Sequence, residues 1–281
     1  MFVPFLIMLR EGVEAALIVG IVASYLAQTG RADALRHVWL GVALSALLCV
    51  IVGAGLEFAR AEFPQKAQEA FEAAVGLLAA VILTGMVFWM RRAALSIRSS
   101  LHGQVDAALA HETGGGWALA GVAFLAVARE GLESVVFLMA AFQQEEVGLE
   151  APLGAALGLV AAVAIGVMIF RFGRKLDLRR FFRWTGVLIL FVATGLLAGA
   201  LRSAHEAGLW NHLQGLAYDL SEVVPIDGIV GTLLSGLFGY RDAPSVGEVA
   251  VYLAYLVPAL LLFLRGGGPQ AMRPTGQLRN A

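Results

Sequence analysis

Charged residues are scarce in this sequence. Asp, Glu, Lys and Arg make up 15% of its 281 residues, whereas hydrophobic residues make up 59%. Soluble domains carry about 25% charged residues, so this composition excludes a soluble globular protein. Apolar runs of about 20 residues, the length that crosses the hydrocarbon core of a bilayer, recur along the chain. The sequence therefore predicts an all-α polytopic membrane protein.

The sequence has only one cysteine and no recognisable processing signal. The single cysteine, Cys49, excludes an intrachain disulfide and a cysteine-based metal site. Met1 leads almost directly into an apolar run, without a basic segment or a small-residue cleavage site, so we expect a retained first span. No nucleotide-binding loop is present, and we therefore expect neither direct ATP coupling nor a permanently bound cofactor.

The apolar runs predict seven transmembrane spans. We expect each span to be a helix, because a backbone in lipid must satisfy its own hydrogen bonds. The spans are 3–28, 37–58, 70–91, 117–142, 151–171, 184–202 and 246–265. The expected organisation is a first three-helix unit (1–92), a connection (93–116), a second three-helix unit (117–202), an extracytoplasmic segment (203–245), a seventh helix (246–265) and a disordered tail (266–281).

The charges are sorted between the two sides of these spans. Fourteen of the 20 lysines and arginines fall in the first, third and fifth connections and in the tail. By the positive-inside rule these segments are cytoplasmic, so the C-terminus is expected inside and the N-terminus outside. Thirteen acidic residues fall on the outer side, against four inside. This asymmetry would concentrate cations at the outer surface of a cytoplasmic (inner) membrane.

Two spans contain the same charged motif, Arg-Glu-Gly-x-Glu. It occurs at 10–14 and again at 129–133, each time within an apolar run. A helix turns about 100° per residue, so the three charged side chains of each motif share one face. A charge at the bilayer centre costs roughly 2.5–3.5 kcal/mol when it faces lipid. We therefore expect the two charged faces to meet each other or a hydrated cavity.

The motif belongs to a longer internal repeat. Leu40-Gly41, Leu44 and Gly53 match Leu153-Gly154, Leu157 and Gly166, and Gly76 with Thr84-Gly85 matches Gly186 with Thr194-Gly195. Because each unit has three spans, the second copy must enter the membrane from the opposite side. The pattern predicts a 3+3 inverted repeat plus a seventh helix, an arrangement typical of secondary transporters with a site near the midplane.

The paired motifs favour a metal-cation site. Glu11, Glu14, Glu130 and Glu133 offer hard oxygen ligands, whereas Arg10 and Arg129 neutralise only two of the four carboxylates. A purely structural network of salt bridges is the alternative, but it gives no reason to retain a surplus of two negative charges. A cation would remove that surplus.

Acidic residues near the outer surface form a second candidate site. Glu69 and Glu72 lie three residues apart at the outer start of the third span and could receive a cation, or they could simply favour a helix N-terminus. His205 and His212 could share one helical face near the same surface, although solvated loop histidines are the simpler interpretation.

Several motifs resemble the oxidase-dependent iron permease family, which includes fungal high-affinity iron permeases and bacterial Efe-system permeases. They are the two Arg-Glu-Gly-x-Glu motifs, Leu83-Thr84-Gly85-Met86 with Trp89-Met90, Asp219-Leu220-Ser221-Glu222, Gly239-Tyr240, Pro244-Ser245 and Tyr252. The resemblance covers nearly all of the chain before the tail.

The resemblance implies a seven-helix iron permease. In such a protein Glu11, Glu14, Glu130 and Glu133 handle the iron ion as substrate, and Arg10 and Arg129 are essential beside them. Asp219 and Glu222 correspond to an external iron-receiving motif, in which Leu220 replaces the small residue of fungal members. The family also implies extracytoplasmic partners, namely an oxidase or peroxidase and an iron-binding lipoprotein.

Other functions remain open from the residues alone. Carboxylates do not fix metal identity, so a permease for lead, manganese or another divalent cation, or a cation/proton exchanger, would fit the same motifs. An intramembrane metal-dependent enzyme fits less well, because we would expect sets of histidine and serine within the spans. We expect a transporter and not an enzyme.

Overall fold

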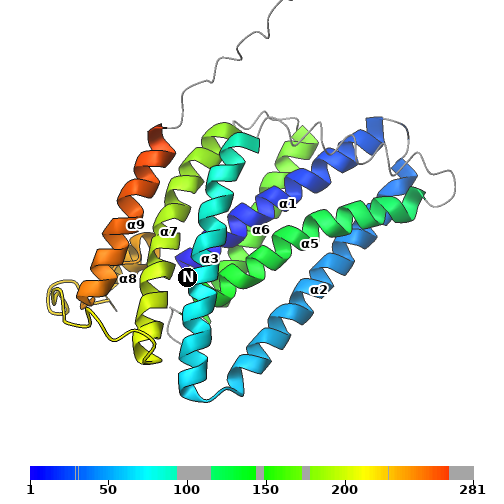
Figure 1. Ribbon diagram of the computed structural model, residues 1–281. Helices are drawn as coiled ribbons and strands as arrows, with labels where there is room; N and C mark the ends of the chain where they lie inside the picture. The colour runs from blue at the N-terminus through cyan, green and yellow to red at the C-terminus, as the bar shows by residue number, and fades with distance from the viewer. Residues whose placement is uncertain are drawn as a thin grey trace, which may run out of the picture.

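The chain folds into long α-helices (Figure 1). The computed structural model describes residues 1–28, 30, 32–93, 115–143, 149–172, 178–226 and 228–265. No strand occurs among these residues. The elements are α1 (Phe2–Gln28), the short 3-10 helix η1 (Ala32–Ala34), α2 (Leu35–Ala61), α3 (Gln65–Ala93), α5 (Gly115–Phe142), α6 (Glu150–Phe172), α7 (Leu178–Glu206), α8 (Ile229–Phe238) and α9 (Val246–Arg265).

Five of these helices, α2, α3, α6, α7 and α9, are long and apolar enough to cross a membrane. The two remaining long helices, α1 and α5, each carry one charged motif within an otherwise apolar sequence. The helices extend beyond the predicted spans by up to several residues, because a helix continues into the interface after its apolar segment ends. Most of the connection 93–116 and all of the tail 266–281 lie outside the described residues.

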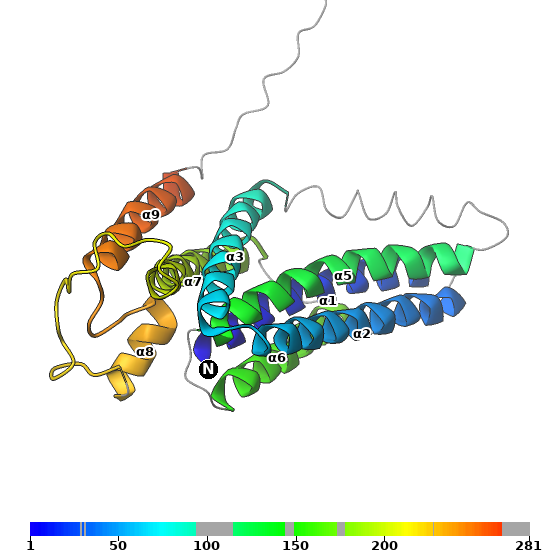
Figure 2. The same ribbon diagram turned by 60° about the horizontal axis from the view of Figure 1, so that its bottom comes forward.

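The helices of the two predicted units pack against each other in pairs. The most extensive contacts join α1 to α6, α2 to α5, and α3 to α7. In both ribbon views α1, α2, α5 and α6 lie together, and α3, α7, α8 and α9 form the other side of the molecule (Figures 1 and 2). The motif helices α1 and α5 also contact each other, and α3 contacts α5. This arrangement brings the two charged motifs into the same region.

Glycines allow two of these helix pairs to approach closely. A Cβ atom added at Gly12 of α1 would lie 2.6 Å from Ala162 Cβ of α6, and one added at Gly131 of α5 would lie 2.5 Å from Cys49 Sγ of α2. Both glycines are the central residues of the charged motifs. The missing side chains therefore bring a neighbouring helix against each motif, as small residues do at helix interfaces in membranes.

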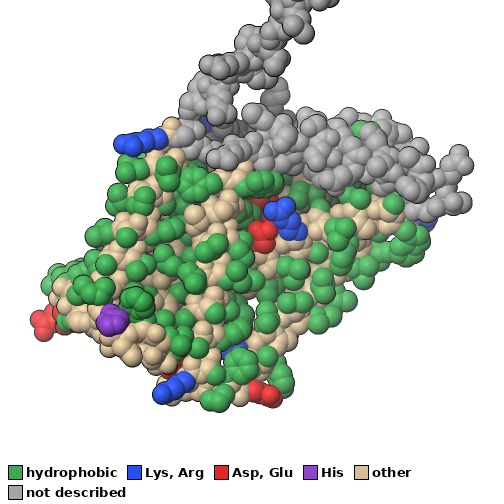
Figure 3. All heavy atoms as spheres, in the orientation of Figure 1, with side chains coloured by type: hydrophobic (Ala, Val, Ile, Leu, Met, Phe, Trp, Pro, Cys, Tyr) green, Lys and Arg blue, Asp and Glu red, His purple; other side chains and the backbone are tan. Residues whose placement is uncertain are grey.

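The outer surface of the helices is strongly apolar. Figure 3 shows a face covered mainly by hydrophobic side chains, with only scattered charged groups. On α2 the exposed side chains include Trp39, Val50 and Phe58, and on α6 they include Leu153 and Val160. An apolar surface of this extent is typical of a protein solvated by lipid. The composition, the helices and this surface together identify a multi-pass membrane protein.

The segment that joins α7 to α9 is held by backbone and tyrosine hydrogen bonds. Leu216 and Ser245 form an isolated antiparallel bridge. The hydroxyl groups of Tyr218, Tyr240 and Tyr252 donate to the carbonyl oxygens of Arg241, Val224 and Phe238, respectively. Within the segment α8 ends at Gly239, whose φ of 64° is the left-handed conformation that glycine adopts without strain.

Candidate metal centre

The first motif places three ionisable side chains in the protein interior. Arg10, Glu11 and Glu14 lie on one face of α1, and their exposed fractions are 2%, 1% and 6%. Arg10 Nη1 lies 3.0 Å from Glu11 Oε1, and Arg10 Nη2 lies 3.2 Å from Glu14 Oε1. One buried arginine thus bridges two buried carboxylates of its own helix.

The second motif contributes a third carboxylate to the same place. Glu130 of α5 is 8% exposed, and a carboxylate oxygen from each of Glu11, Glu14 and Glu130 lies within 4.8 Å of the other two. In the described part of the chain this is the single group of three or more acidic, histidine or cysteine side chains at that spacing. The group has three carboxylates from two helices and is hereafter called the carboxylate cluster.

Each carboxylate of the cluster has a buried oxygen that makes no hydrogen bond to the described residues. These atoms are Glu11 Oε2, Glu14 Oε1 and Glu130 Oε2. Glu14 Oε1 is close enough to Arg10 for an ion pair, but the geometry does not align a hydrogen bond. A buried carboxylate oxygen without a hydrogen-bond donor loses the hydrogen bonds that it makes to water, and no donor among the described residues replaces them.

The charge balance of the carboxylate cluster favours a bound cation. Three ionised carboxylates and Arg10 carry a formal charge of −2. Burial of unpaired charge is strongly unfavourable, and carboxylate oxygens prefer hard or borderline cations. The arrangement could therefore hold a divalent metal ion, or release it when the carboxylates are protonated.

Arg129 and Glu133 lie differently from their counterparts in the first motif. Arg129 Nε donates to Glu133 Oε1 at 3.1 Å, and the two side chains are 59% and 18% exposed. Glu133 is not one of the three residues of the carboxylate cluster. The second motif thus divides: Glu130 points into the cluster, and Arg129 and Glu133 form an ion pair beside it.

Helix α3 supplies uncharged contacts to both arginines. Arg10 Nη1 donates to Met86 Sδ at 3.0 Å, and Arg10 Nη2 donates to Met90 Sδ at 3.2 Å. The guanidinium carbon of Arg129 lies 5.3 Å from the centre of the Trp89 ring. Reasoning from sequence quoted these three residues in the family resemblance but assigned them no role. Their spacing of three and four residues, which places them on one helical face, was the available signal.

The acidic residues of the second candidate site do not gather into a group of this kind among the described residues. Glu72 forms an ion pair with Arg60 at 3.1 Å and so joins α3 to α2, whereas Glu69 accepts a hydrogen bond from Gln65. Glu222 is exposed in the segment that follows α7.

Asp219 makes a local turn with Ser221. Its Oδ1 atom accepts hydrogen bonds from the Ser221 hydroxyl at 2.6 Å and from the Ser221 backbone N–H at 3.0 Å. These bonds to the ionised form lower the pKa of Asp219 below its usual value. The carboxylate is therefore kept ionised at lower pH than an ordinary aspartate.

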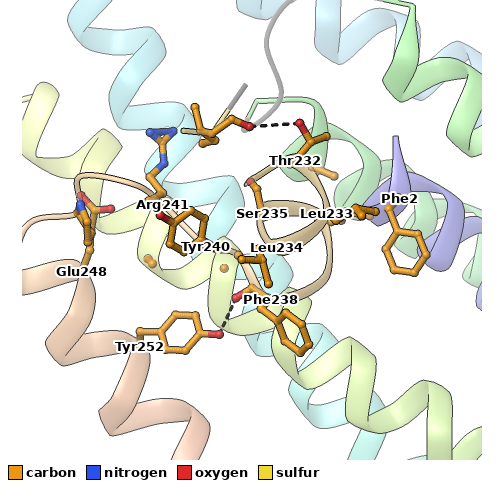
Figure 4. A pocket seen from close by; sticks show the side chains of 18 of the residues that line it. Phe2, Thr232, Leu233, Leu234, Ser235, Phe238, Tyr240, Arg241, Glu248 and Tyr252 are labelled. Carbon is orange, nitrogen blue, oxygen red and sulfur yellow. Dashed lines mark hydrogen bonds between the residues drawn. The ribbon is translucent and has the colours of Figure 1, made fainter. Parts of the chain in front are cut away.

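A cavity of about 1260 Å³ lies between the start of α1, the end of α7, α8 and α9. Figure 4 shows Phe2, Leu233 and Tyr252 around it, together with Arg241 and Glu248. None of the three cluster glutamates lines this cavity. Phe5, which does, precedes Glu11 by six residues, or roughly 9 Å along the helix. The cavity and the carboxylate cluster are thus separate features at successive levels of α1.

Comparison with known proteins gives consistent matches. Residues 1–266 match the model of the Iron permease FTR1 family. The chain is 55% identical over 263 residues to the Ferrous iron permease EfeU of Yersinia pestis, with 94% of this chain and 93% of that protein covered. It is 54% identical over 264 residues to the protein of the same name from Escherichia coli O6:K15:H31 (strain 536 / UPEC), covering 94% and 95%. No solved structure matches the chain.

Proposed function

Because this chain belongs to the Iron permease FTR1 family, we propose that it imports ferrous iron across the cytoplasmic membrane through the carboxylate cluster. The observation that carries the proposal is the burial of Glu11, Glu14 and Glu130 within 4.8 Å of one another, each with an oxygen that lacks a hydrogen-bond donor among the described residues. The names of the related proteins support iron as the substrate. A buried site with a formal charge of −2 favours a divalent ion, since Fe(II) neutralises it.

All four motif glutamates and both arginines take part in this proposal. Glu11, Glu14 and Glu130 form the ligand set, and Glu133 lies one helical turn from Glu130 on the same helix. Glu133 is 18% exposed on its side chain, so it could receive or pass on the ion at the edge of the cluster. Arg10 and Arg129 limit the negative charge and fix the carboxylates that they contact.

We further propose that the seven long helices all cross the membrane as a 3+3 inverted repeat plus α9. Close glycine contacts occur in matched pairs between the two units, which supports this arrangement. Gly12 contacts Ala162, and its counterpart Gly131 contacts Cys49; the two glycines are 119 residues apart, and the two contacted residues are 113 apart. Two further pairs show the same separations, now with the glycines 113 and the contacted residues 119 apart: Gly41 with Ala120 and Gly154 with Met1, and Gly53 with Val135 and Gly166 with Ala16. The same offsets recur in all three pairs, as a two-fold relation between the units requires.

In this arrangement the N-terminus faces outward and the C-terminus faces the cytoplasm. Asp219 and Glu222 then lie on the outer side, where their negative charge would attract iron before it enters the membrane. Iron supplied by an extracytoplasmic oxidase or peroxidase, or by an iron-binding lipoprotein, would arrive at this surface. We propose transport and not enzymatic catalysis, because the related proteins are named as permeases.

Iron binding to the purified protein tests the shared site. The double variants Glu11→Gln/Glu14→Gln and Glu130→Gln/Glu133→Gln should each abolish high-affinity Fe(II) binding, and their combination should do no further harm, as expected for groups that act as a unit. Glu62→Gln is the matched control, because Glu62 is exposed at the end of α2 and lies outside the cluster. Retention of half the wild-type stoichiometry at unchanged affinity in each double variant would show two independent sites.

Uptake into proteoliposomes tests the substrate. Fe(II) should enter vesicles that contain the wild-type protein, and vesicles with Glu11→Gln/Glu14→Gln should resemble empty ones. Competing Mn(II) and Pb(II) are added at matched concentrations, and a pH gradient is imposed in separate runs. Faster uptake of Mn(II) or Pb(II) than of Fe(II) would contradict iron as the preferred substrate.

A further inference from the structure

The two motif arginines are held by one face of a third helix. Met86 and Met90 of α3 contact the two terminal nitrogens of Arg10, and Trp89 lies under the guanidinium of Arg129. Positions 86, 89 and 90 are neighbours on a helix surface. We call these three residues the α3 clamp.

The contacts of the α3 clamp leave the charge of Arg10 intact. Each terminal nitrogen of Arg10 contacts one carboxylate and one thioether, Nη1 at 3.0 Å from each and Nη2 at 3.2 Å from each. A thioether accepts a hydrogen bond weakly and carries no charge. It therefore fixes the guanidinium without competing with Glu11 and Glu14 for its positive charge, as a third carboxylate would.

Arg129 is held by a different uncharged contact. Its guanidinium lies 5.3 Å from the ring centre of Trp89, within the distance of a cation–π interaction. On its other side it donates to Glu133. Both arginines thus have carboxylates as charged partners and an uncharged side chain of α3 as a support.

The equivalent positions of α7 carry no side chains that could make such contacts with an arginine. The repeat aligns Gly76 and Thr84-Gly85 of α3 with Gly186 and Thr194-Gly195 of α7. In this alignment the positions of α7 equivalent to Met86, Trp89 and Met90 are Leu196, Gly199 and Ala200. Leucine, glycine and alanine side chains offer neither a hydrogen-bond acceptor nor an aromatic ring. The α3 clamp is therefore not required by helix packing within a unit, because the equivalent helix does without it.

We propose that Met86, Trp89 and Met90 are positioning residues for iron transport, which hold Arg10 and Arg129 at the carboxylate cluster without neutralising them. This inference rests on the proposed iron uptake. It assigns to α3 the task of keeping the guanidinium groups in place while an ion enters and leaves the cluster, when their carboxylate partners turn toward the metal.

Paired substitutions at the two methionines separate positioning from packing. Leucine preserves the volume of methionine but removes the acceptor, whereas glutamine keeps an acceptor at similar length. If the clamp positions Arg10, Met86→Leu/Met90→Leu should raise the Fe(II) concentration for half-maximal uptake on the order of ten-fold, the factor expected for a lost hydrogen bond to a charged group. Met86→Gln and Met90→Gln, tested singly, should stay within about two-fold of wild type.

A packing role predicts the opposite order, since Met86 and Met90 belong to the buried apolar core around α3. Leucine would then be tolerated, and glutamine would be harmful. Met139→Leu is the matched control, because Met139 is a buried methionine of α5 to which, within the described residues, neither arginine donates a hydrogen bond. The contact of Trp89 with Arg129 is tested in the same way: Trp89→Phe keeps an aromatic ring and should retain uptake, whereas Trp89→Leu removes the ring and should reduce uptake. Trp184→Leu, at an exposed tryptophan of α7, is the control.

All variants are measured in the same vesicles as wild type and Glu11→Gln/Glu14→Gln, after each is shown to be folded by its melting temperature. Absence of wild-type Fe(II) uptake contradicts the proposed function. Wild-type uptake with an unchanged half-saturating concentration in Met86→Leu/Met90→Leu contradicts the α3 clamp alone, because leucine is the substitution that the fold tolerates. Larger defects with glutamine than with leucine likewise overturn it.

Discussion

Substitution of Gly12 by alanine should disrupt the close packing of α1, which carries the first motif, against α6. The new Cβ would lie 2.6 Å from Ala162 Cβ, whereas carbon atoms in contact prefer about 3.5–4.0 Å. Helix α6 would therefore have to move away from α1 by about 1 Å. Overpacking of this kind costs about 1–3 kcal/mol, and the gain in helix propensity from alanine offsets about 1 kcal/mol of it.

The control for this substitution lies on the same helix. A Cβ atom added at Gly20 would have no atom of a neighbouring element within 4 Å, so Gly20→Ala should stabilise the protein slightly through helix propensity alone. A destabilisation of 1 kcal/mol lowers the melting temperature by roughly 2–4 °C in a domain of about 150–250 residues. Purified variants in detergent, followed by intrinsic fluorescence on heating, should therefore rank Gly12→Ala below wild type and Gly20→Ala at or above it.

A compensating change gives the stronger test. Ala162→Gly removes the atom that the new methyl group would meet, so the double variant Gly12→Ala/Ala162→Gly should melt higher than the sum of the single effects predicts. We expect a coupling energy of about 1–2 kcal/mol, which is typical of residues in direct contact. Equal melting temperatures for Gly12→Ala and Gly20→Ala, or additive effects in the cycle, would refute the close approach of α1 and α6.

Three further outcomes follow from features outside this contact. Arg129→Lys keeps the charge but loses the Nε hydrogen bond to Glu133, so uptake should fall several-fold at matched expression; uptake equal to wild type would mean that a point charge suffices. Ser221→Ala removes the hydroxyl hydrogen bond, the larger of the two causes that lower the pKa of Asp219, and keeps the bond from the backbone N–H. The Asp219 carboxylate should therefore become protonated at higher pH than in wild type, so uptake by the variant should be weaker near pH 4 and unchanged at pH 7, and identical pH profiles would contradict a role for this turn. Cysteine introduced at residue Ser221 should react with an impermeant reagent in intact cells, whereas cysteine at Ser99, which lies outside the described residues, should not; the reverse pattern would overturn the topology.

Composition and periodicity predicted the helical membrane fold, and the residue types of the motifs led to the iron permease family, which the comparisons confirm. The helix bounds were predicted less well, because apolar composition marks the segment in lipid and not the end of the helix. Thus α2 runs from Leu35 to Ala61 where the predicted span was 37–58. Seven crossings and the inverted repeat stay predictions.

The side chains of the candidate centre were predicted in part. Helical spacing placed Arg10, Glu11 and Glu14 on one face, but it treated the second motif as equivalent to the first. The i,i+4 spacing indicated a pairing of Arg129 with Glu133, but sequence alone did not indicate that Glu130 would join the carboxylate cluster while Glu133 stays outside it. Sequence alone also did not indicate that methionines and a tryptophan of α3 would contact the two arginines from another part of the chain. The spacing of these three residues marks one face of α3, but local periodicity does not indicate which residues of another helix that face contacts.

The pairing of α1 with α6 has a consequence for how the protein is made. Helix α1 leaves the ribosome before α5 and α6, which begin at residues 115 and 150. At synthesis rates of about 5–20 residues per second, α6 follows α1 by roughly 6–25 s. During this interval the first motif has no second unit to bury it, and the ion pairs of Arg10 with Glu11 and Glu14 within α1 are the available means of lowering its insertion cost. The stage of biogenesis most sensitive to Arg10 should therefore be the insertion of a half-synthesised chain, before the carboxylate cluster can form.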